Sequence, residues 1–206
     1  MTNVKFYYFN IRGIGDTARL LLHYGKIDFE DIRVSDEQWA TTNLKEVSVT
    51  HKLPILQIDG HTLIESNAIN RFLAKRLGLA GKDEYEQAHV DAVADIVKDF
   101  NVAVMPWFYR LKGWIEGSPV EHKAKAFDAN VKVYLPIFVN ILKQAGSGFV
   151  SASGLTWADF TFSEYLLSLS QVEPTLLDEY PTLKEFLARI RQVPQVKDYY
   201  ATRNEA

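Results

Sequence analysis

The hydrophobic pattern divides the chain into two parts of different character. Up to residue 77, short apolar runs of strand type alternate with amphipathic segments of helical spacing. Beyond a link at residues 78–83, the apolar positions keep the helical spacing and no convincing strand pattern is found. We therefore predict an α/β domain over residues 1–79, followed by an all-α domain over residues 84–206.

The first part is predicted to have the element order βαβ–α–ββα. Its elements are a strand at residues 4–9, a helix at 16–24, a strand at 29–34, a short or irregular helix within 36–47, two strands around residues 59–60 and a helix at 67–77. Such an order implies a right-handed crossover between two parallel strands, and hence a mixed sheet.

A proline, a hairpin turn and a helix start fall close together in residues 52–66. The run at residues 55–58 is of strand type, and Asp59-Gly60 is the strongest short-range signal for a hairpin. Pro54 has no N–H, which leaves backbone groups beside it open to a ligand. Ser66 opens the next helix, where its hydroxyl, free N–H groups and the helix dipole favour a carboxylate or phosphate. A strand edge beside such a helix end suits a small peptide.

The second part is predicted to consist of helices. They are a helix at residues 84–105 that Pro106 ends or kinks, one at 120–144 interrupted by Pro136, one from Thr156 to about residue 169, one at 181–190 and a short one after Pro194. Thr156-Trp157-Ala158-Asp159 is a capping box with Asp in place of Glu, and Leu155 with Phe160 can form its hydrophobic staple.

Composition excludes several kinds of chemistry. The chain has no cysteine, so it has no disulfide, thiolate metal site or protein thiol, and sulfur chemistry would need sulfur from the substrate. A net charge of −3 with scattered basic residues argues against a nucleic-acid partner. The five histidines lack ligand spacing, so we expect no metal. The polar start and the absence of any apolar run of about 20 residues predict a cytoplasmic protein without a membrane partner.

Several segments carry a resemblance to a known family. They are residues 5–13, Trp39, the proline and hairpin of residues 52–66, and Gly154-Leu155-Thr156-Trp157-Ala158-Asp159-Phe160. In this order, over nearly all 206 residues, the sequence resembles the soluble glutathione transferases, and residues 5–13 look like the tyrosine strand of the sigma class. The resemblance implies a thioredoxin-like N-terminal domain with a cis proline before its third strand, glutathione as co-substrate and a homodimer.

Tyr8 is the candidate catalytic residue. Tyr7 and Tyr8 face opposite sides of a strand, and periodicity alone does not choose between them. Tyr8 lies near the carboxyl end of the strand, where ligands of open α/β sheets bind, and the resemblance also selects it. A phenolic O–H donated to sulfur would favour the thiolate, which is the nucleophilic form of a thiol.

The resemblance also implies a set of glutathione contacts. Ser66 would hold the α-carboxylate of the γ-glutamyl group, and Glu65 its ammonium group. The main chain of Leu53 would pair with the cysteinyl backbone. Lys52 and the indole N–H of Trp39 would reach the glycine carboxylate. Further members of the set are Tyr8, Pro54, His51, Lys45 (with Asn43 as its alternative) and Asp99 of the partner subunit.

The electrophile is expected in an apolar cleft that the helical domain supplies. Helix positions and the resemblance together place there Phe9, Ile14, Met105, Trp107, Tyr109 and Tyr165. The predicted activity is conjugation of glutathione to soft, hydrophobic electrophiles. Two alternatives remain open, namely glutathione-dependent isomerisation of prostaglandin H2 to prostaglandin D2, as in some relatives, and a non-catalytic ligand-binding or crystallin-like protein. A thioredoxin-type oxidoreductase is excluded because it needs a protein thiol.

Overall fold

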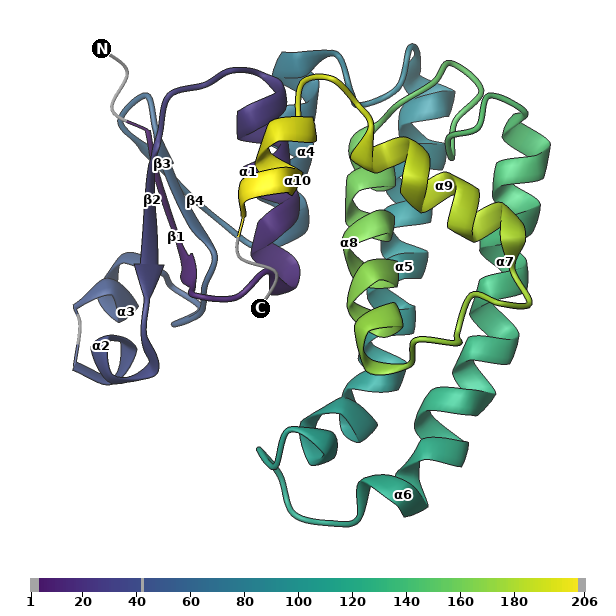
Figure 1. The fold of residues 1–206 in the computed structure, drawn as a ribbon. Helices are drawn as coiled ribbons and strands as arrows, with labels where there is room; N and C mark the ends of the chain where they lie inside the picture. Colours follow the sequence, from purple (N-terminus) through teal and green to yellow (C-terminus); the bar gives the residue numbers. More distant parts are fainter. Residues whose placement is uncertain (1–3, 42, 204–206) are drawn as a thin grey trace.

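The structure, a computed structural model, describes residues 4–41 and 43–203. It has a mixed four-stranded sheet with helices in its N-terminal part and a helical C-terminal part, as predicted (Figure 1). The sheet order is β2-β1-β3-β4, with strands β1 (Lys5–Phe9), β2 (Glu30–Val34), β3 (Ile55–Ile58) and β4 (His61–Ile64).

Strand β1 lies inside the sheet and carries the two adjacent tyrosines. It runs parallel to β2 and antiparallel to β3. Phe6 and Tyr8 are buried, whereas Tyr7 between them is half-buried. The guanidinium of Arg19 lies over both buried rings, 5.3 Å from the centroid of Phe6 and 5.7 Å from that of Tyr8. Tyr8 therefore points to the face of the sheet that carries the first helix.

The helices of the first part divide between two places. A 3-10 turn, η1 (Gly13–Gly15), leads into α1 (Asp16–Tyr24). Figure 1 shows α1 and α4 (Ser66–Leu77) between the sheet and the helical part of the molecule. The weakly patterned residues 36–47 form two short helices, α2 (Asp36–Thr41) and α3 (Leu44–Val47), near one end of the sheet.

The second part is helical within the described residues. Its elements are α5 (Glu84–Leu111), α6 (Pro119–His122), the π-helical segment η2 (Lys123–Asp128), α7 (Ala129–Ala145), α8 (Trp157–Val172), α9 (Pro181–Arg191) and α10 (Lys197–Thr202). The predicted capping box is present at the start of α8, and the short helix predicted after Pro194 is α10. No helix of the described chain is both long enough and apolar enough to cross a bilayer.

Two prolines do not end their helices. Helix α5 continues through Pro106 to Leu111, and α7 contains Pro136. An interior proline costs a helix about 3 kcal/mol. At Pro106 packing offsets this cost, because Trp107 is buried with its ring centroid 4.4 Å from that of Phe127. The guanidinium of Arg110 also donates to the Pro106 carbonyl at 2.6 Å.

Helix α10 returns the chain to the first part of the molecule. Figure 1 shows it beside α1. The ring of Tyr199 stacks on His23 of α1 with centroids 4.2 Å apart, and its hydroxyl donates to Asp16 at 2.8 Å. Residues from the two ends of the chain therefore meet next to the turn that follows β1.

Candidate active site

The hydroxyl of Tyr8 lies beside the turn between β1 and α1. Tyr8 is 6% exposed, and its oxygen accepts a hydrogen bond from the amide of Ile14 at 3.3 Å. A phenolic hydroxyl carries one hydrogen and two lone pairs. The amide occupies a lone pair, so the hydroxyl hydrogen can be donated to a ligand.

Two glycines allow the turn to approach this tyrosine closely. Gly13 has φ +42°, and a Cβ on it would lie 2.7 Å from the Tyr8 oxygen. A Cβ on Gly15 would lie 2.3 Å from Cδ1 of the same ring. Any side chain at either position would displace the ring or the turn. The glycines therefore fix the distance between the Ile14 amide and the Tyr8 hydroxyl.

Burial sets the protonation state of Tyr8. Loss of solvation raises the pKa of Tyr8 to about 12, although the Ile14 amide and the positive charge of Arg19 act in the opposite direction. The hydroxyl therefore stays protonated at neutral pH. It can stabilise a developing or resident anion by donating a hydrogen bond, but it cannot serve as a base.

The backbone beside β3 offers a second set of groups. The Leu53–Pro54 peptide bond is cis, as the resemblance implied. Leu53 and Pro54 are buried, whereas Lys52 and His51 are exposed next to them. Two exposed residues are thus followed by two buried ones at the entry to the strand.

The start of α4 differs by one residue from the prediction. The helix begins at Ser66, and Glu65 precedes it with φ +66° and no side-chain cap. Ser66 therefore belongs to the first turn, where amide groups lack partners inside the helix. A non-glycine residue at positive φ costs about 1–3 kcal/mol and is concentrated at ligand sites. Glu65 is exposed and Ser66 half-buried, so both can meet a ligand.

Trp39, Lys45 and His51 form one group at the edge of the sheet. The Trp39 ring packs edge-on against Phe9 with centroids 6.0 Å apart, and the Nζ of Lys45 lies 5.6 Å from the Trp39 ring. His51 Nδ1 donates to the Lys45 carbonyl at 2.7 Å. Asn43, the alternative to Lys45, is exposed before α3. The structure thus brings Lys45 next to Trp39, and a role for it in binding stays a prediction.

The six residues expected around the electrophile separate into two groups. Around Tyr8 lie Ile14, Phe9 with its ring centroid 5.7 Å away, and Tyr109, which is near enough to influence the pKa of Tyr8. The other group belongs to the helical part. It comprises half-buried Met105, Trp107, which is only 4% exposed, and Tyr165, whose hydroxyl donates to the Phe100 carbonyl at 3.2 Å. The structure does not place Trp107 on an open surface.

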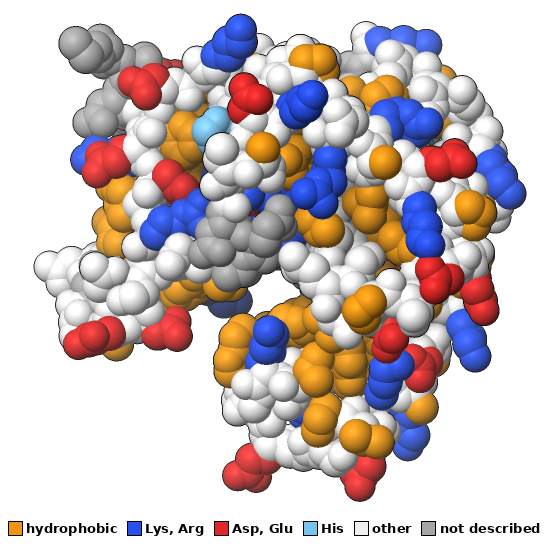
Figure 2. Space-filling model, viewed as in Figure 1, with side chains coloured by type: hydrophobic (Ala, Val, Ile, Leu, Met, Phe, Trp, Pro, Cys, Tyr) orange, Lys and Arg blue, Asp and Glu red, His pale blue; other side chains and the backbone are white. Residues whose placement is uncertain are grey.

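Trp114 is a candidate that the sequence pattern did not select. It is 61% exposed, and its ring centroid is 5.6 Å from that of Tyr109. Its amide donates to the Tyr109 carbonyl at 2.8 Å, so the loop after α5 folds back on the helix end. In Figure 2 hydrophobic side chains gather on the lobe that carries α6, across an open notch from the sheet. The sequence signal that could have identified this candidate is a tryptophan in a short segment between two glycines, Gly113 and Gly117.

The acidic residues of α5 are mostly solvent-facing. Asp95 and Asp99 are exposed, and Asp91 pairs with Arg71 at 2.8 Å. Among residues 4–41 and 43–203, no group of three or more His, Asp or Glu side chains is placed to hold a metal ion. The expected role of Asp99 of the partner subunit stays a prediction.

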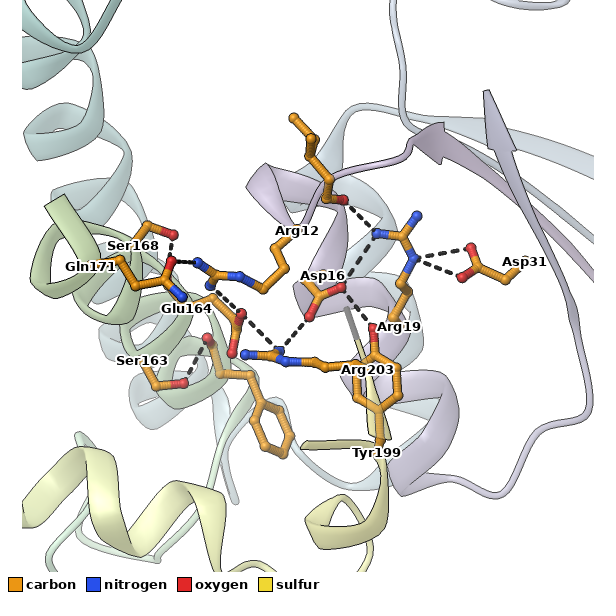
Figure 3. Close-up of polar contacts among 12 residues, drawn as sticks. Arg12, Asp16, Arg19, Asp31, Ser163, Glu164, Ser168, Gln171, Tyr199 and Arg203 are labelled. Carbon is orange, nitrogen blue, oxygen red and sulfur yellow. Dashed lines mark hydrogen bonds and ion pairs between the residues drawn. The ribbon is translucent and has the colours of Figure 1, made fainter. Parts of the chain in front are cut away.

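A network of buried charges adjoins the Tyr8 turn, and most of it was missed from the sequence. Arg19 pairs with Asp16 at 3.3 Å and with Asp31 at 3.0 Å, while Asp159 accepts the capping hydrogen bonds of α8. The unforeseen members are Glu164, Tyr199 and Arg203 (Figure 3).

Comparison with protein families gives matches in both parts of the chain. A model described as glutathione S-transferase, N-terminal domain, matches residues 4–75. A model described as glutathione S-transferase, C-terminal domain, matches residues 98–203.

Known proteins match along almost the full length. Glutathione S-transferase 1 of Ascaris suum is 36% identical over 204 residues, which are 98% of this chain and 98% of the relative. The crystal structure of the glutathione S-transferase from Ascaris lumbricoides has a TM-score of 0.92 at 34% identity, covering 99% of this chain and 98% of the other. A structure described as a Nu-class GST from Haemonchus contortus has a TM-score of 0.89 at 32% identity, covering 100% and 99% of the two chains.

Proposed function

This chain belongs to the glutathione S-transferase family, and on that premise we propose that Tyr8 donates its phenolic hydrogen to the sulfur of glutathione and stabilises the thiolate. The observation that carries the proposal is the hydrogen-bonding state of the Tyr8 hydroxyl. The Ile14 amide occupies a lone pair at 3.3 Å, and burial raises the pKa of Tyr8 to about 12. A protonated hydroxyl with its hydrogen directed to a ligand is what a thiolate requires.

One hydrogen bond from Tyr8 would lower the thiol pKa of glutathione far enough for the reaction. A free thiol has a pKa of about 8.5, so only about 3% is ionised at pH 7. A hydrogen bond to a charged group contributes about 1.5–3 kcal/mol. Since 1.4 kcal/mol corresponds to about one pKa unit, the bond would lower the thiol pKa by about 1–2 units. The thiolate would then be a large fraction of bound glutathione at neutral pH.

The bound tripeptide would lie along the edge of β3. The backbone of Leu53 would pair with the cysteinyl unit, as in an added strand. The first turn of α4 at Ser66 would take the γ-glutamyl carboxylate, because amide groups and the helix dipole face it there. Exposed Glu65 would take the ammonium group, and Lys52 and Trp39 the glycine end. The proposed glutathione site would be completed by Lys45, His51 and Pro54.

We propose soft, hydrophobic electrophiles as the second substrates. With an aryl halide, the sulfur lone pair forms a carbon–sulfur bond and the halide leaves with the electrons of the broken bond. With an unsaturated aldehyde, sulfur adds to the β carbon and the α carbon takes a proton from water. Exposed Ile14 and Tyr109, with the rings of Phe9 and Trp114, supply an apolar surface near Tyr8 for either substrate.

Class, assembly and location are further parts of the proposal. The sigma class is supported by the tyrosine strand at residues 5–13, and one solved relative is described as Nu-class. A cytoplasmic homodimer would bring Asp99 of the partner subunit toward the ammonium of glutathione. Light scattering should give twice the mass of one chain. In the dimer, Asp99→Asn should raise the KM for glutathione and leave the mass unchanged.

The decisive experiment combines retention on immobilised glutathione with turnover of a substrate panel. The panel contains an aryl halide, an unsaturated aldehyde, a hydroperoxide and prostaglandin H2. Retention with conjugation of the first two substrates supports the transferase. Turnover of prostaglandin H2 alone would assign an isomerase, and retention without any turnover would assign a ligand carrier. Failure to be retained would contradict the proposed glutathione site.

A further inference from the structure

A buried charge network joins the two domains beside the Tyr8 turn. We call Arg12, Asp16, Glu164 and Arg203 the interdomain cluster (Figure 3). Their side chains are between 0% and 4% exposed. Arg12 and Asp16 flank the turn, Glu164 belongs to α8 and Arg203 follows α10. The cluster therefore links the catalytic end of the sheet domain to two helices of the other domain.

Arg203 bridges the two carboxylates of this cluster. Its guanidinium donates to Oδ2 of Asp16, and Nη1 lies 2.9 Å from Oε2 of Glu164. The ring of Tyr200 lies 4.4 Å from the guanidinium carbon, and Tyr199 donates to the other oxygen of Asp16 at 2.8 Å. Each of these groups keeps Arg203 in a single arrangement, with its planar donors matched to two acceptors.

The same cluster fixes the turn that contacts Tyr8. Arg12 pairs with Glu164 at 3.2 Å, and the Asp16 amide donates to the Arg12 carbonyl at 3.0 Å. Between these two residues lie Gly13, Ile14 and Gly15, which pack on the Tyr8 ring and hold its oxygen. Both ends of the turn are thus attached to the helical domain, and Arg203 holds the end at Asp16.

Electrostatics determines what the loss of Arg203 does. Burial raises the pKa of Glu164 and the charge of Asp16 raises it further, whereas Arg203 and Arg12 lower it, so the two carboxylates repel each other across the arginine. Removing one partner of a buried ion network leaves uncompensated charge. Without Arg203, the carboxylate of Asp16 and that of Glu164 would separate. That movement would shift the Ile14 amide away from the Tyr8 hydroxyl.

We propose that Arg203 is a positioning residue for catalysis, which acts through Asp16 and the turn at residues 13–15 to hold the Tyr8 hydroxyl against the sulfur of glutathione. This inference rests on the proposed role of Tyr8. It assigns a part in the reaction to a residue that follows the last helix and touches neither substrate.

The test compares Arg203→Met with Tyr8→Phe in the full chain, using glutathione and an aryl halide. We expect Arg203→Met to keep the KM for glutathione, because the groups at Leu53 and Ser66 are untouched. We expect kcat to fall about tenfold and the thiol pKa, read from thiolate absorbance, to rise by about one unit. Arg203→Lys should recover part of both. Arg189→Met, which removes a hydrogen bond to the Gly148 carbonyl within the helical domain, is the matched control and should match wild type.

The outcomes separate the two hypotheses. If Tyr8→Phe leaves the thiol pKa unchanged, the proposed function fails. If Tyr8→Phe raises the thiol pKa but Arg203→Met does not, only the positioning role of Arg203 is overturned. That role is also overturned if the activity of Arg203→Met falls only in proportion to its folded fraction. Should Arg203→Met not fold, Arg203→Lys takes its place, because it keeps the positive charge and loses the planar pair of donors. A thiol pKa above the wild-type value in Arg203→Lys would then support the role, and a wild-type value would contradict it.

Discussion

The ring of Trp114 lies against the ring of Tyr109, with centroids 5.6 Å apart and planes tilted by 46°. Phe108 meets Trp114 edge-on with ring centroids 6.0 Å apart. Trp114 nevertheless leaves 61% of its surface exposed. Such an aromatic surface, held by two neighbouring rings, can cover a flat apolar substrate.

Trp114→Ala should therefore weaken binding of the electrophile and leave binding of glutathione unchanged. Loss of one aromatic contact of about 0.5–1.5 kcal/mol predicts a rise of about 2- to 12-fold in the KM of an aryl halide. Steady-state kinetics with each substrate varied in turn measures it. Tyr85→Ala removes an aromatic ring that is 80% exposed at the start of α5 and serves as the control. An equal effect of both substitutions would contradict a specific role for Trp114.

Tyr8→Phe should retain glutathione and lose most turnover. The substitution keeps the ring and removes the hydroxyl, so the thiol pKa should rise by about 1–2 units. Thiolate absorbance against pH, together with kcat, measures the change. Tyr7→Phe is the matched control, because the Tyr7 hydroxyl donates to Gln57 at 3.1 Å from the opposite side of β1. Wild-type turnover in Tyr8→Phe would refute the assignment.

Gly15→Ala should impair both stability and turnover. The added Cβ would lie 2.3 Å from Cδ1 of Tyr8, and such overpacking costs about 1–3 kcal/mol. Gly78→Ala is an informative comparison, since Gly78 has φ +71° with no atom within 4 Å of a Cβ. It should cost about 1–2 kcal/mol of stability from backbone strain alone. Urea denaturation and kcat per folded molecule distinguish the two, and turnover should fall only in Gly15→Ala.

Glu86 should account for part of the loss of folding stability at acidic pH. Burial opposes its ionisation, but hydrogen bonds from the Lys82 amide and from Ser151 and Ser153 outweigh it and lower the pKa of Glu86 to about 2. The ordinary value is 4.5, so the contribution is complete above pH 4.5 and is lost as pH falls toward 2. Glu86→Gln should therefore be less stable than wild type at neutral pH and should lose less stability on acidification.

The measurement for Glu86 is the urea midpoint at a series of pH values from neutral to acidic. Glu84→Gln, two residues earlier and exposed, is the control and should follow the wild-type curve. Identical pH dependence in Glu86→Gln and wild type would show that the hydrogen bonds do not stabilise the ionised form.

Local patterns predicted the elements well because their causes are local. The Asp59-Gly60 turn, the capping box at Thr156 and the alternation along the sheet each depend on neighbours in sequence. Of the two outcomes predicted at Pro106, an end or a kink, the end was wrong, since the burial of Trp107 against Phe127 is a tertiary effect. The π-helical segment at Lys123–Asp128 was not predicted, because the sequence carried no visible signal for it.

The candidate site was predicted in part. Tyr7 and Tyr8 could not be separated by periodicity, because which face of β1 is covered depends on α1, and the resemblance supplied the choice. Trp114 lies in a loop, where spacing carries little information. Glu164 and Arg203 were missed because each pairs with residues more than 150 positions away, and charge alone does not identify such partners.

The pairing of Asp16 with Arg203 spans 187 positions of sequence. On the ribosome, at roughly 5–20 residues per second, Asp16 would wait about 10–40 s for its arginine to be synthesised. During that interval the nascent protein carries a carboxylate at the catalytic turn without its final counter-ion. The proposed role of Arg203 therefore implies that full preorganisation of the tyrosine is a late event of biosynthesis, and that a newly made enzyme becomes competent only after α10 has docked.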